Sequence, residues 1–208
     1  MSESRAAEPG PAKRSRPMPA GDRNNNPEGI GFWALIAEDF RTHDRDPLAV
    51  GFWAVAFHRF GNWRMGVRSK WLRAPMSCVY RGLYIFVKLF FTVDLPYNMT
   101  LGRRLRIWHH GGIYLGACSI GDDVHLRHNV TMGVVHRGEG NAKPTIGNRV
   151  DIGPGAAILG SVEVGDDVVI GANSVVVRDV PPNSTVFGVP ARPVNLKSAA
   201  GTRGEEKG

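Results

Sequence analysis

An aliphatic residue returns at every sixth position between residues 146 and 180, and this period constrains the fold more than any other feature of the chain. The repeating residues are Ile146, Ile152, Ile158, Val164, Ile170 and Val176. An α-helix repeats at about 3.6 residues and an exposed strand at about two, so a period of six predicts one short strand and one tight turn per repeat. Three strands would close a triangular coil, and stacked coils would bury the aliphatic side chains in one column. The alternative, a run of ordinary hairpins, requires turns every eight to twelve residues or so.

The same period begins at Leu101 and is interrupted twice before residue 146. One extra residue precedes Ile120, and a longer break follows Met132. Residues 134–145 within this break are polar and glycine-rich, which predicts a loop that protrudes from the coil. The repeats as a whole predict about four triangular coils, whose flat faces would be covered if three copies packed around an axis.

The chain divides into four parts. Residues 1–29 are rich in proline, glycine, asparagine and charge, which predicts a disordered tail. Aromatic and aliphatic residues at helical spacing predict an α-helical domain over residues 30–95. The hexads and their closing prolines predict a β-helix domain over residues 96–194, and residues 195–208 form a polar C-terminal tail. The expected fold is therefore mainly β, a parallel β-helix that an α-helical segment precedes.

The formal net charge of +7 has no accompanying nucleic-acid signature. Basic residues without an aromatic-interleaved motif indicate a solvated surface rather than nucleic-acid binding. Attraction to an anionic cofactor or to anionic lipid headgroups stays open.

Cysteine usage and hydropathy bear on the compartment. Cys78 and Cys118 fall in different parts of the chain, which favours unpaired thiols in a cytoplasmic protein. The N-terminal residues lack the apolar core of a secretory signal. Residues 83–93 are apolar, but the segment is short and contains Lys88, so it is typical of a buried or interfacial helix rather than of a membrane span.

A histidine pair stands where the hexads call for small or polar surface residues. His109 and His110 follow Trp108 and precede two glycines. Imidazole is suited to removing a proton near neutral pH, so a histidine on a rigid coil is a candidate general base. The alternative is two surface histidines on a turn. Neighbouring residues on a strand point to opposite faces, so the pair does not indicate a metal site.

Several short motifs accompany the hexads. They are Arg45-Asp46-Pro47, His58-Arg59-Phe60-Gly61-Asn62-Trp63, Val130-Thr131-Met132-Gly133 and Gly188-Val189-Pro190-Ala191-Arg192. With these motifs, the chain resembles the serine acetyltransferases of the hexapeptide-repeat acyltransferases from about Leu35 to Val194. Hexads and the closing Gly-Val-Pro-Ala-Arg are common to many acyltransferases, whereas the helical front and its motifs are typical of the serine acetyltransferase branch.

This resemblance implies a left-handed parallel β-helix that assembles as a trimer or a dimer of trimers. It also implies transfer of acetyl from acetyl-CoA to the hydroxyl of L-serine, a step of cysteine biosynthesis. The family's catalytic histidine falls on His109 and its partner aspartate on Asp94, while an acceptor-binding aspartate falls on Asp46. In the implied mechanism His109 takes the hydroxyl proton, Asp94 orients the ring, and the oxygen attacks the thioester.

The resemblance also implies where coenzyme A would lie, in a groove between neighbouring subunits. Gly153, Pro154, Gly171 and Ala172 match positions where the family keeps small residues beside the pantetheine arm. Arg192 is a candidate for the phosphates, and a surface role is the alternative. No metal is expected.

This sequence departs from the family at the positions that bind the acceptor. The family's aspartate before the catalytic histidine is replaced by Trp108, and its loop arginine and histidine fall on Ala142 and Lys143. Lys143 can hold a carboxylate as a point charge, without the two-pronged geometry of arginine. Trp108 and Lys143 are therefore candidate acceptor-binding residues, and a sugar hydroxyl in polysaccharide assembly is the rival acceptor.

Two further functions use the same coil. A γ-type carbonic anhydrase requires metal-binding histidines on successive coils, for which only His125, His128 and His136 are candidates. A non-catalytic scaffold would keep the coil without the chemistry, and the match of Asp94 and His109 to the family's positions argues against it.

Overall fold

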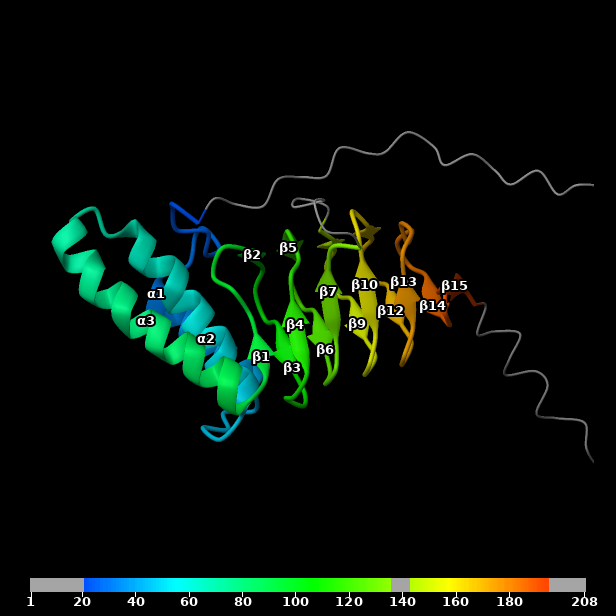
Figure 1. The fold of residues 1–208 in the computed structure, drawn as a ribbon, viewed down its shortest axis with the longest axis horizontal. Coiled ribbons are helices and arrows are strands. Elements are labelled where there is room, and N and C mark those ends of the chain that lie inside the picture. The colour runs from blue at the N-terminus through cyan, green and yellow to red at the C-terminus, as the bar shows by residue number, and fades with distance from the viewer. Residues whose placement is uncertain (1–20, 136–142, 195–208) are drawn as a thin grey trace, which may run out of the picture.

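A computed structural model describes residues 21–135 and 143–194 of the chain. Three segments lie outside the described residues. They are residues 1–20 of the tail expected over residues 1–29, residues 136–142 of the expected loop, and the C-terminal tail 195–208. A helical layer stands at one end of a parallel β-helix, and the strands run in stacked turns away from it (Figure 1).

Within the described residues, the helical layer consists of three α-helices and one short 3-10 helix. These are α1 (Phe32–Thr42), α2 (Val50–Trp63) with the short 3-10 helix η1 (Arg64–Gly66), and α3 (Lys70–Phe90). Asp44 and Arg45 both adopt positive φ directly after α1, and this sharp turn brings the chain back into α2. Helix α2 packs closely on the coil, because a Cβ atom on Gly51 would lie only 2.6 Å from the carbonyl oxygen of Ile107.

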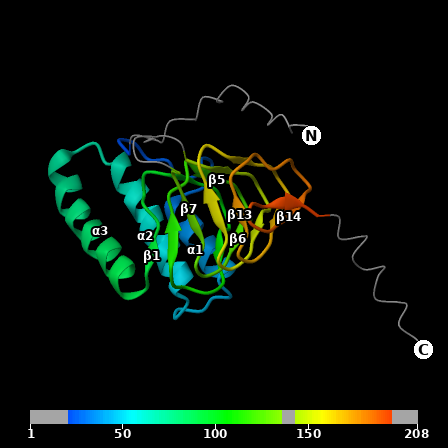
Figure 2. The ribbon, with the colours of Figure 1, turned by 45° about the vertical axis from the view of Figure 1, so that its right-hand side comes forward.

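Fifteen short strands form three sheets, with order β1-β4-β7-β10-β13, order β11-β8-β5-β2, and order β15-β14-β12-β9-β6-β3 (Figures 1 and 2). All pairings are parallel except that of β14 with β15. The strands are β1 (Val93–Asp94), β2 (Thr100–Leu101), β3 (Arg106–Ile107), β4 (Ile113–Leu115), β5 (Ser119–Ile120), β6 (His125–Leu126), β7 (Thr131–Gly133), β8 (Thr145–Ile146), β9 (Asp151–Ile152), β10 (Ala157–Leu159), β11 (Glu163–Val164), β12 (Val169–Ile170), β13 (Val175–Val176), β14 (Thr185–Phe187) and β15 (Arg192–Pro193).

The predicted aliphatic column is confirmed, and it has five turns rather than about four. The hexad aliphatics point inward and are almost fully buried. Val93 begins the extra turn, and Val186 closes the last one after Val180 has bridged to Val164. The sequence period misses these ends because Val93 precedes Leu101 by eight residues and Val180 follows Val176 by four.

One corner of the prism is stabilised by charges that alternate from turn to turn. Arg104, Asp123, Arg149 and Asp167 adopt positive φ where the second sheet turns into the third. Arg104 pairs with Asp123 at 2.5 Å and Arg149 pairs with Asp167 at 2.6 Å. The ion pairs offset part of the strain of a left-handed conformation at residues that carry a side chain.

The first turn of the β-helix has no preceding turn to pair with, and buried polar side chains of the helical layer satisfy its backbone. Arg59 donates to the carbonyl oxygens of Leu101 at 2.8 Å and of Gly102 at 2.6 Å, and it pairs with Asp39 at 3.0 Å. His43 accepts a hydrogen bond from the Ile107 amide at 3.3 Å. The helical layer therefore caps the open end of the coil, where unpaired backbone groups would be costly.

The His58-Arg59-Phe60-Gly61-Asn62-Trp63 motif continues this cap. His58 and Asn62 contact the carbonyl oxygens of Pro96 and Tyr97 at 3.1 and 2.7 Å. A Cβ atom on Gly61 would lie 2.6 Å from the ring of Tyr80, so only glycine allows α3 and the first turn to approach α2. The motif thus acts mainly in joining the two layers.

Residues 21–29, expected to be part of a disordered tail, pack against this junction instead. The Asn25 amide donates to the Asn62 side chain at 3.2 Å, and the Asn26 side chain donates to the Arg59 carbonyl at 2.9 Å. Tyr97 donates its hydroxyl to the carbonyl of Gly21 at 3.1 Å. These contacts are hydrogen bonds of backbone and polar side-chain groups rather than apolar packing, which is why composition alone did not reveal them.

Candidate active site

The histidine pair lies on the corner where the third sheet turns into the first. Residues 108–112 connect β3 to β4, and the next turn of the coil holds them through two backbone hydrogen bonds. The Trp108 amide donates to Leu126 at 3.0 Å, and the Asn129 amide donates to Gly111 at 2.8 Å. The geometry of this corner is therefore fixed by backbone pairing rather than by the side chains it presents.

The four residues expected beside the pantetheine arm lie on the same edge of the prism. Gly153 and Pro154 connect β9 to β10, and Gly171 and Ala172 connect β12 to β13. Backbone hydrogen bonds from Gly155 to His128 at 3.0 Å and from Asn173 to Pro154 at 2.8 Å stack these corners below the histidine corner. The structure thus brings His109 and the four small residues to one edge.

Packing within the chain also requires the two glycines. A Cβ atom on Gly153 would lie 2.6 Å from the Ala172 amide nitrogen, and one on Gly171 would overlap the ring of Phe187 at 1.8 Å. Glycine at these positions is thus explained by the approach of neighbouring turns. A role beside a cofactor stays a prediction for this edge.

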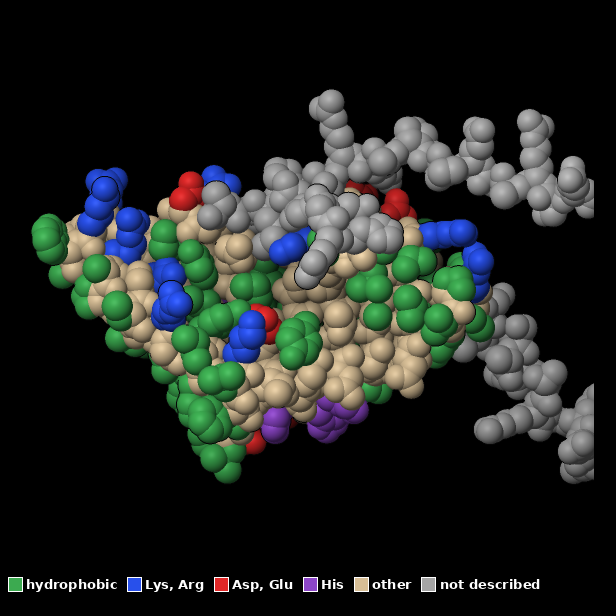
Figure 3. All heavy atoms as spheres, in the orientation of Figure 1, with side chains coloured by type: hydrophobic (Ala, Val, Ile, Leu, Met, Phe, Trp, Pro, Cys, Tyr) green, Lys and Arg blue, Asp and Glu red, His purple; other side chains and the backbone are tan. Residues whose placement is uncertain are grey.

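Both histidines are exposed, and their rings face different neighbours. The His109 ring lies 6.0 Å from the ring of His128, one turn further along the coil. The His110 ring lies edge-on to Phe91 at 5.7 Å, beside the end of α3. Histidine side chains gather along the lower edge of the molecule in Figure 3. An exposed imidazole on a rigid corner is available to a substrate that approaches this edge.

Asp94, the expected partner of His109, is held by α3. Tyr84 donates a hydrogen bond to one carboxylate oxygen, and Lys88 pairs with the other at 2.7 Å. Burial and the hydrogen bond to Asp94 raise the pKa of Tyr84, so the phenol stays protonated and can donate. Among the described residues, the polar partners of Asp94 are these two, and its pairing with His109 stays a prediction.

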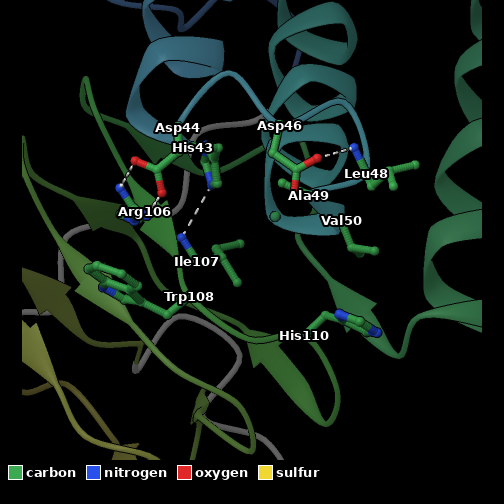
Figure 4. A pocket seen from close by; sticks show the side chains of 11 residues that line it. His43, Asp44, Asp46, Leu48, Ala49, Val50, Arg106, Ile107, Trp108 and His110 are labelled. Carbon is green, nitrogen blue, oxygen red and sulfur yellow. Dashed lines mark hydrogen bonds and ion pairs between the residues drawn. The ribbon is translucent and has the colours of Figure 1, made fainter.

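A pocket of about 240 Å³ opens between the α1–α2 turn and the first turn of the coil (Figure 4). Asp46 enters it from the α1–α2 turn, and Trp108 and His110 line it from the coil. The Asp46 carboxylate accepts from the Leu48 amide at 2.8 Å, which fixes its direction. Two of the three residues expected to bind the acceptor therefore share one pocket.

Arg106 adds a cation to this pocket that sequence reasoning missed. It donates to the Asp44 carboxylate and to the Thr42 carbonyl at 2.8 Å, and it lies 3.8 Å above the Trp108 ring. The hydrogen bond from Arg106 also lowers the pKa of Asp44. Its place in the hexad could have revealed it. Arg106 and Trp108 lie two residues apart on β3 and its extension, so their side chains point to the same outward side.

Trp108 is a wall of this pocket rather than a charged contact. Its indole is 44% exposed, with Arg106 over one face and the His125 ring edge-on at 5.8 Å. The position where the resemblance implies a carboxylate thus presents an aromatic surface next to a cation.

Lys143 and Arg192 lie away from the histidine corner of the same chain. Lys143 precedes β8 on a different corner, where its carbonyl contacts the Cys118 sulfur at 3.6 Å. Arg192 is exposed on β15 at the far end of the coil. His136 and Ala142 fall outside the described residues.

Within residues 21–135 and 143–194, no three His, Cys, Asp or Glu side chains group closely enough to hold a metal ion. None of the described helices combines the length and hydropathy needed to cross a membrane.

Known proteins share this architecture. Residues 143–178 match the family model described as bacterial transferase hexapeptide (six repeats). The serine acetyltransferase of Mycobacterium tuberculosis (strain ATCC 25618 / H37Rv) is 37% identical over 160 residues, which cover 72% of this chain and 67% of the relative.

Two solved structures are similar at 31% identity. Soybean serine acetyltransferase complexed with serine has a TM-score of 0.65, covering 78% of this chain and 69% of that chain. Serine acetyltransferase from Brucella abortus strain S19 in complex with coenzyme A has a TM-score of 0.64, covering 77% and 66%.

The stacked hexads and the matched repeats define the class as the hexapeptide-repeat transferases. The identity extends beyond the repeats into the helical layer and over most of each chain. The chain belongs to the serine acetyltransferase family, which makes it an acyltransferase and confirms the resemblance seen in the sequence.

Proposed function

We propose that the protein transfers the acetyl group of acetyl-CoA to the hydroxyl of L-serine, with His109 as the general base. The observation that carries the proposal is the placement of His109 on the same prism edge as Gly153, Pro154, Gly171 and Ala172 in a member of this family. Relatives have been solved with serine and with coenzyme A, which supports both substrates. The proposal includes a role of the product in cysteine biosynthesis in the cytoplasm, as the family resemblance implies.

The proposed reaction is a direct transfer. The His109 imidazole removes the hydroxyl proton as the hydroxyl oxygen attacks the thioester carbonyl. When the tetrahedral intermediate collapses, the carbon–sulfur bond breaks, and the imidazolium returns the proton to the thiolate of coenzyme A. Asp94 would stabilise the imidazolium, which requires its carboxylate to serve His109 as well as Lys88.

The pocket beside this corner supports a small zwitterionic acceptor. Asp46 offers a carboxylate for the ammonium group, and Arg106, which pairs with Asp44 in this structure, would have to share its guanidinium with the carboxylate of the acceptor. Lys143 and Arg192 would take part only if a neighbouring subunit brought them to the edge. A homotrimer, the assembly implied by the flat faces of the coil, is therefore part of the proposal.

A sugar hydroxyl is the second candidate acceptor, and Trp108 is the observation that favours it. Its half-exposed indole stands where the resemblance implies an aspartate for the ammonium group of serine. An aromatic face packs well against the apolar side of a sugar ring, whereas it offers no negative charge to an amino acid.

The test measures release of the coenzyme A thiol with L-serine, L-homoserine and a panel of sugars as acceptors. We expect thiol release with L-serine at a higher kcat/KM than with the sugars. A preference for a sugar would select the second candidate, and inactivity with every acceptor would leave the coil as a scaffold.

A further inference from the structure

Helix α3 presents an apolar face to solvent. It contacts α2, η1 and β1 through one side only, on which Tyr80 and Val87 are buried. Figures 1 and 2 both place α3 at the outer edge of the molecule, with α2 on its inner side and β1 of the coil beside its C-terminal end. The opposite side of the helix is therefore uncovered in the described protein.

This uncovered side consists of large hydrophobic side chains. Trp71 is 91% exposed, and Leu89 and Phe90 are 70% and 71% exposed. Helical spacing places Trp71, Phe86 and Leu89 on the side opposite to Tyr80 and Val87. A helix of 21 residues is about 30 Å long, and exposed hydrophobic side chains occur near both of its ends. They form an extended apolar face rather than single scattered surface residues.

A row of cations flanks the apolar face. Lys70, Arg81 and Lys88 are separated by eleven and seven residues, which are close to whole numbers of helical turns, so they share one flank. Figure 3 shows Lys and Arg side chains beside hydrophobic ones over the helical layer. Apolar residues on one side and cations along the border are the pattern of a helix that lies in a membrane interface.

The apolar face could be covered by a second copy of the chain or by a lipid surface, and the charge of the surrounding segment distinguishes the two. Residues 47–93 contain seven Lys and Arg residues and not one Asp or Glu, and all of the seven except the buried Arg59 and Arg64 are at least partly exposed. Two copies that met through this face would bring like charges together, whereas an anionic lipid surface would attract it. Because α3 does not qualify as a membrane span, the helix would lie along the surface.

We propose that α3 docks the protein on anionic lipid membranes, with Trp71, Phe86 and Leu89 inserted among the acyl chains and Lys70 and Arg81 against the headgroups. The proposal is independent of which acceptor the enzyme acetylates.

The test is cosedimentation of the full-length protein with vesicles of phosphatidylcholine alone and of phosphatidylcholine with roughly one third phosphatidylglycerol. We expect binding to the anionic vesicles that weakens as salt is added. Arg81→Glu should lower the partition coefficient by roughly twentyfold, since each basic residue near the surface contributes about fivefold. Arg178→Glu changes the net charge equally on the last turn of the coil and should retain binding.

Leu89→Ser tests the apolar contribution and should weaken binding by about tenfold, whereas Val177→Ser, an exposed apolar residue of the coil, should not. Sedimentation velocity without lipid measures the size of the assembly and so tests whether a second copy of the chain covers this face instead. Failure to bind anionic vesicles, or equal losses in Arg81→Glu and Arg178→Glu, would overturn the proposal. So would a smaller assembly formed by Leu89→Ser, because the face would then be a subunit interface.

Discussion

His109 and His110 are neighbours with different surroundings, which allows the general base to be tested at the scale of one residue. We expect His109→Ala to lower kcat for acetyl transfer by at least about a hundredfold, the usual effect of losing a general base. Its thermal midpoint should stay near that of the wild type, because the ring is exposed and outside the aliphatic column. His110→Ala is the matched control and should keep kcat near the wild-type value, with any effect confined to KM for the acceptor because His110 lines the pocket. If kcat fell strongly in His110→Ala and not in His109→Ala, the general base would be His110 rather than His109.

Asp94 offers a second test, because Lys88 already neutralises it. If Asp94 stabilises the imidazolium, Asp94→Asn should lower kcat by tenfold or more while KM for acetyl-CoA changes little. Lys88→Met removes the other partner of the same carboxylate and should leave kcat nearly intact. Equal losses in the two variants would mean that Asp94 acts only by holding α3.

Trp108 is the residue through which acceptor choice can be changed. Trp108→Asp places a carboxylate near the ammonium group of an amino acid and removes an aromatic surface, so the ratio of kcat/KM for L-serine to that for a sugar should rise by about tenfold. Trp108→Phe keeps an aromatic ring and should leave the ratio close to that of the wild type. An unchanged ratio in Trp108→Asp would show that Trp108 does not contact the acceptor.

At the scale of elements, the junction between helices and coil depends on one buried ion pair. Arg59 and Asp39 are fully buried, and Arg59 also satisfies two carbonyl groups of the first turn. Arg59→Met should lower the free energy of unfolding by about 3–5 kcal/mol, because it leaves a buried carboxylate unpaired. Arg149→Met breaks an exposed pair, which water and salt screen, and should cost far less. Urea unfolding measures both, and similar losses would contradict the assigned cap.

The sequence period was enough to predict the column, because every hexad repeats the same short strand and turn and so stacks on its neighbours in the same way. The ends of the column escaped prediction, since Val93 and Val186 enter it through turns of irregular length. The pocket was predicted only in part, for a different reason. Asp46 and Trp108 were found by resemblance, but Arg106 joins them only because the α1–α2 turn folds back onto β3.

At the scale of the whole molecule, two buried histidines join the layers in their neutral form. His58 donates through Nδ1 to Pro96 at 3.1 Å and accepts at Nε2 from the side chain of Asn62 at 3.1 Å. His43 bridges Asp39 and Ile107 in the same manner. A proton added to Nε2 of either ring would face a donor, so protonation opposes the contact between helices and coil.

Stability should therefore fall as the solution is acidified. Burial, reinforced by Arg59, lowers the pKa of His58 to about 3, and burial also lowers the pKa of His43. Between the unfolded value of about 6.5 and these lowered values the unfolded chain binds more protons, so the free energy of unfolding decreases as pH decreases. His58 alone should account for about 2 kcal/mol between pH 7 and pH 5. Urea unfolding at pH 7, 6 and 5 measures the slope, which His58→Gln should reduce because glutamine can donate and accept without titrating. The same slope in His58→Gln and the wild type would mean that other groups cause the acid sensitivity.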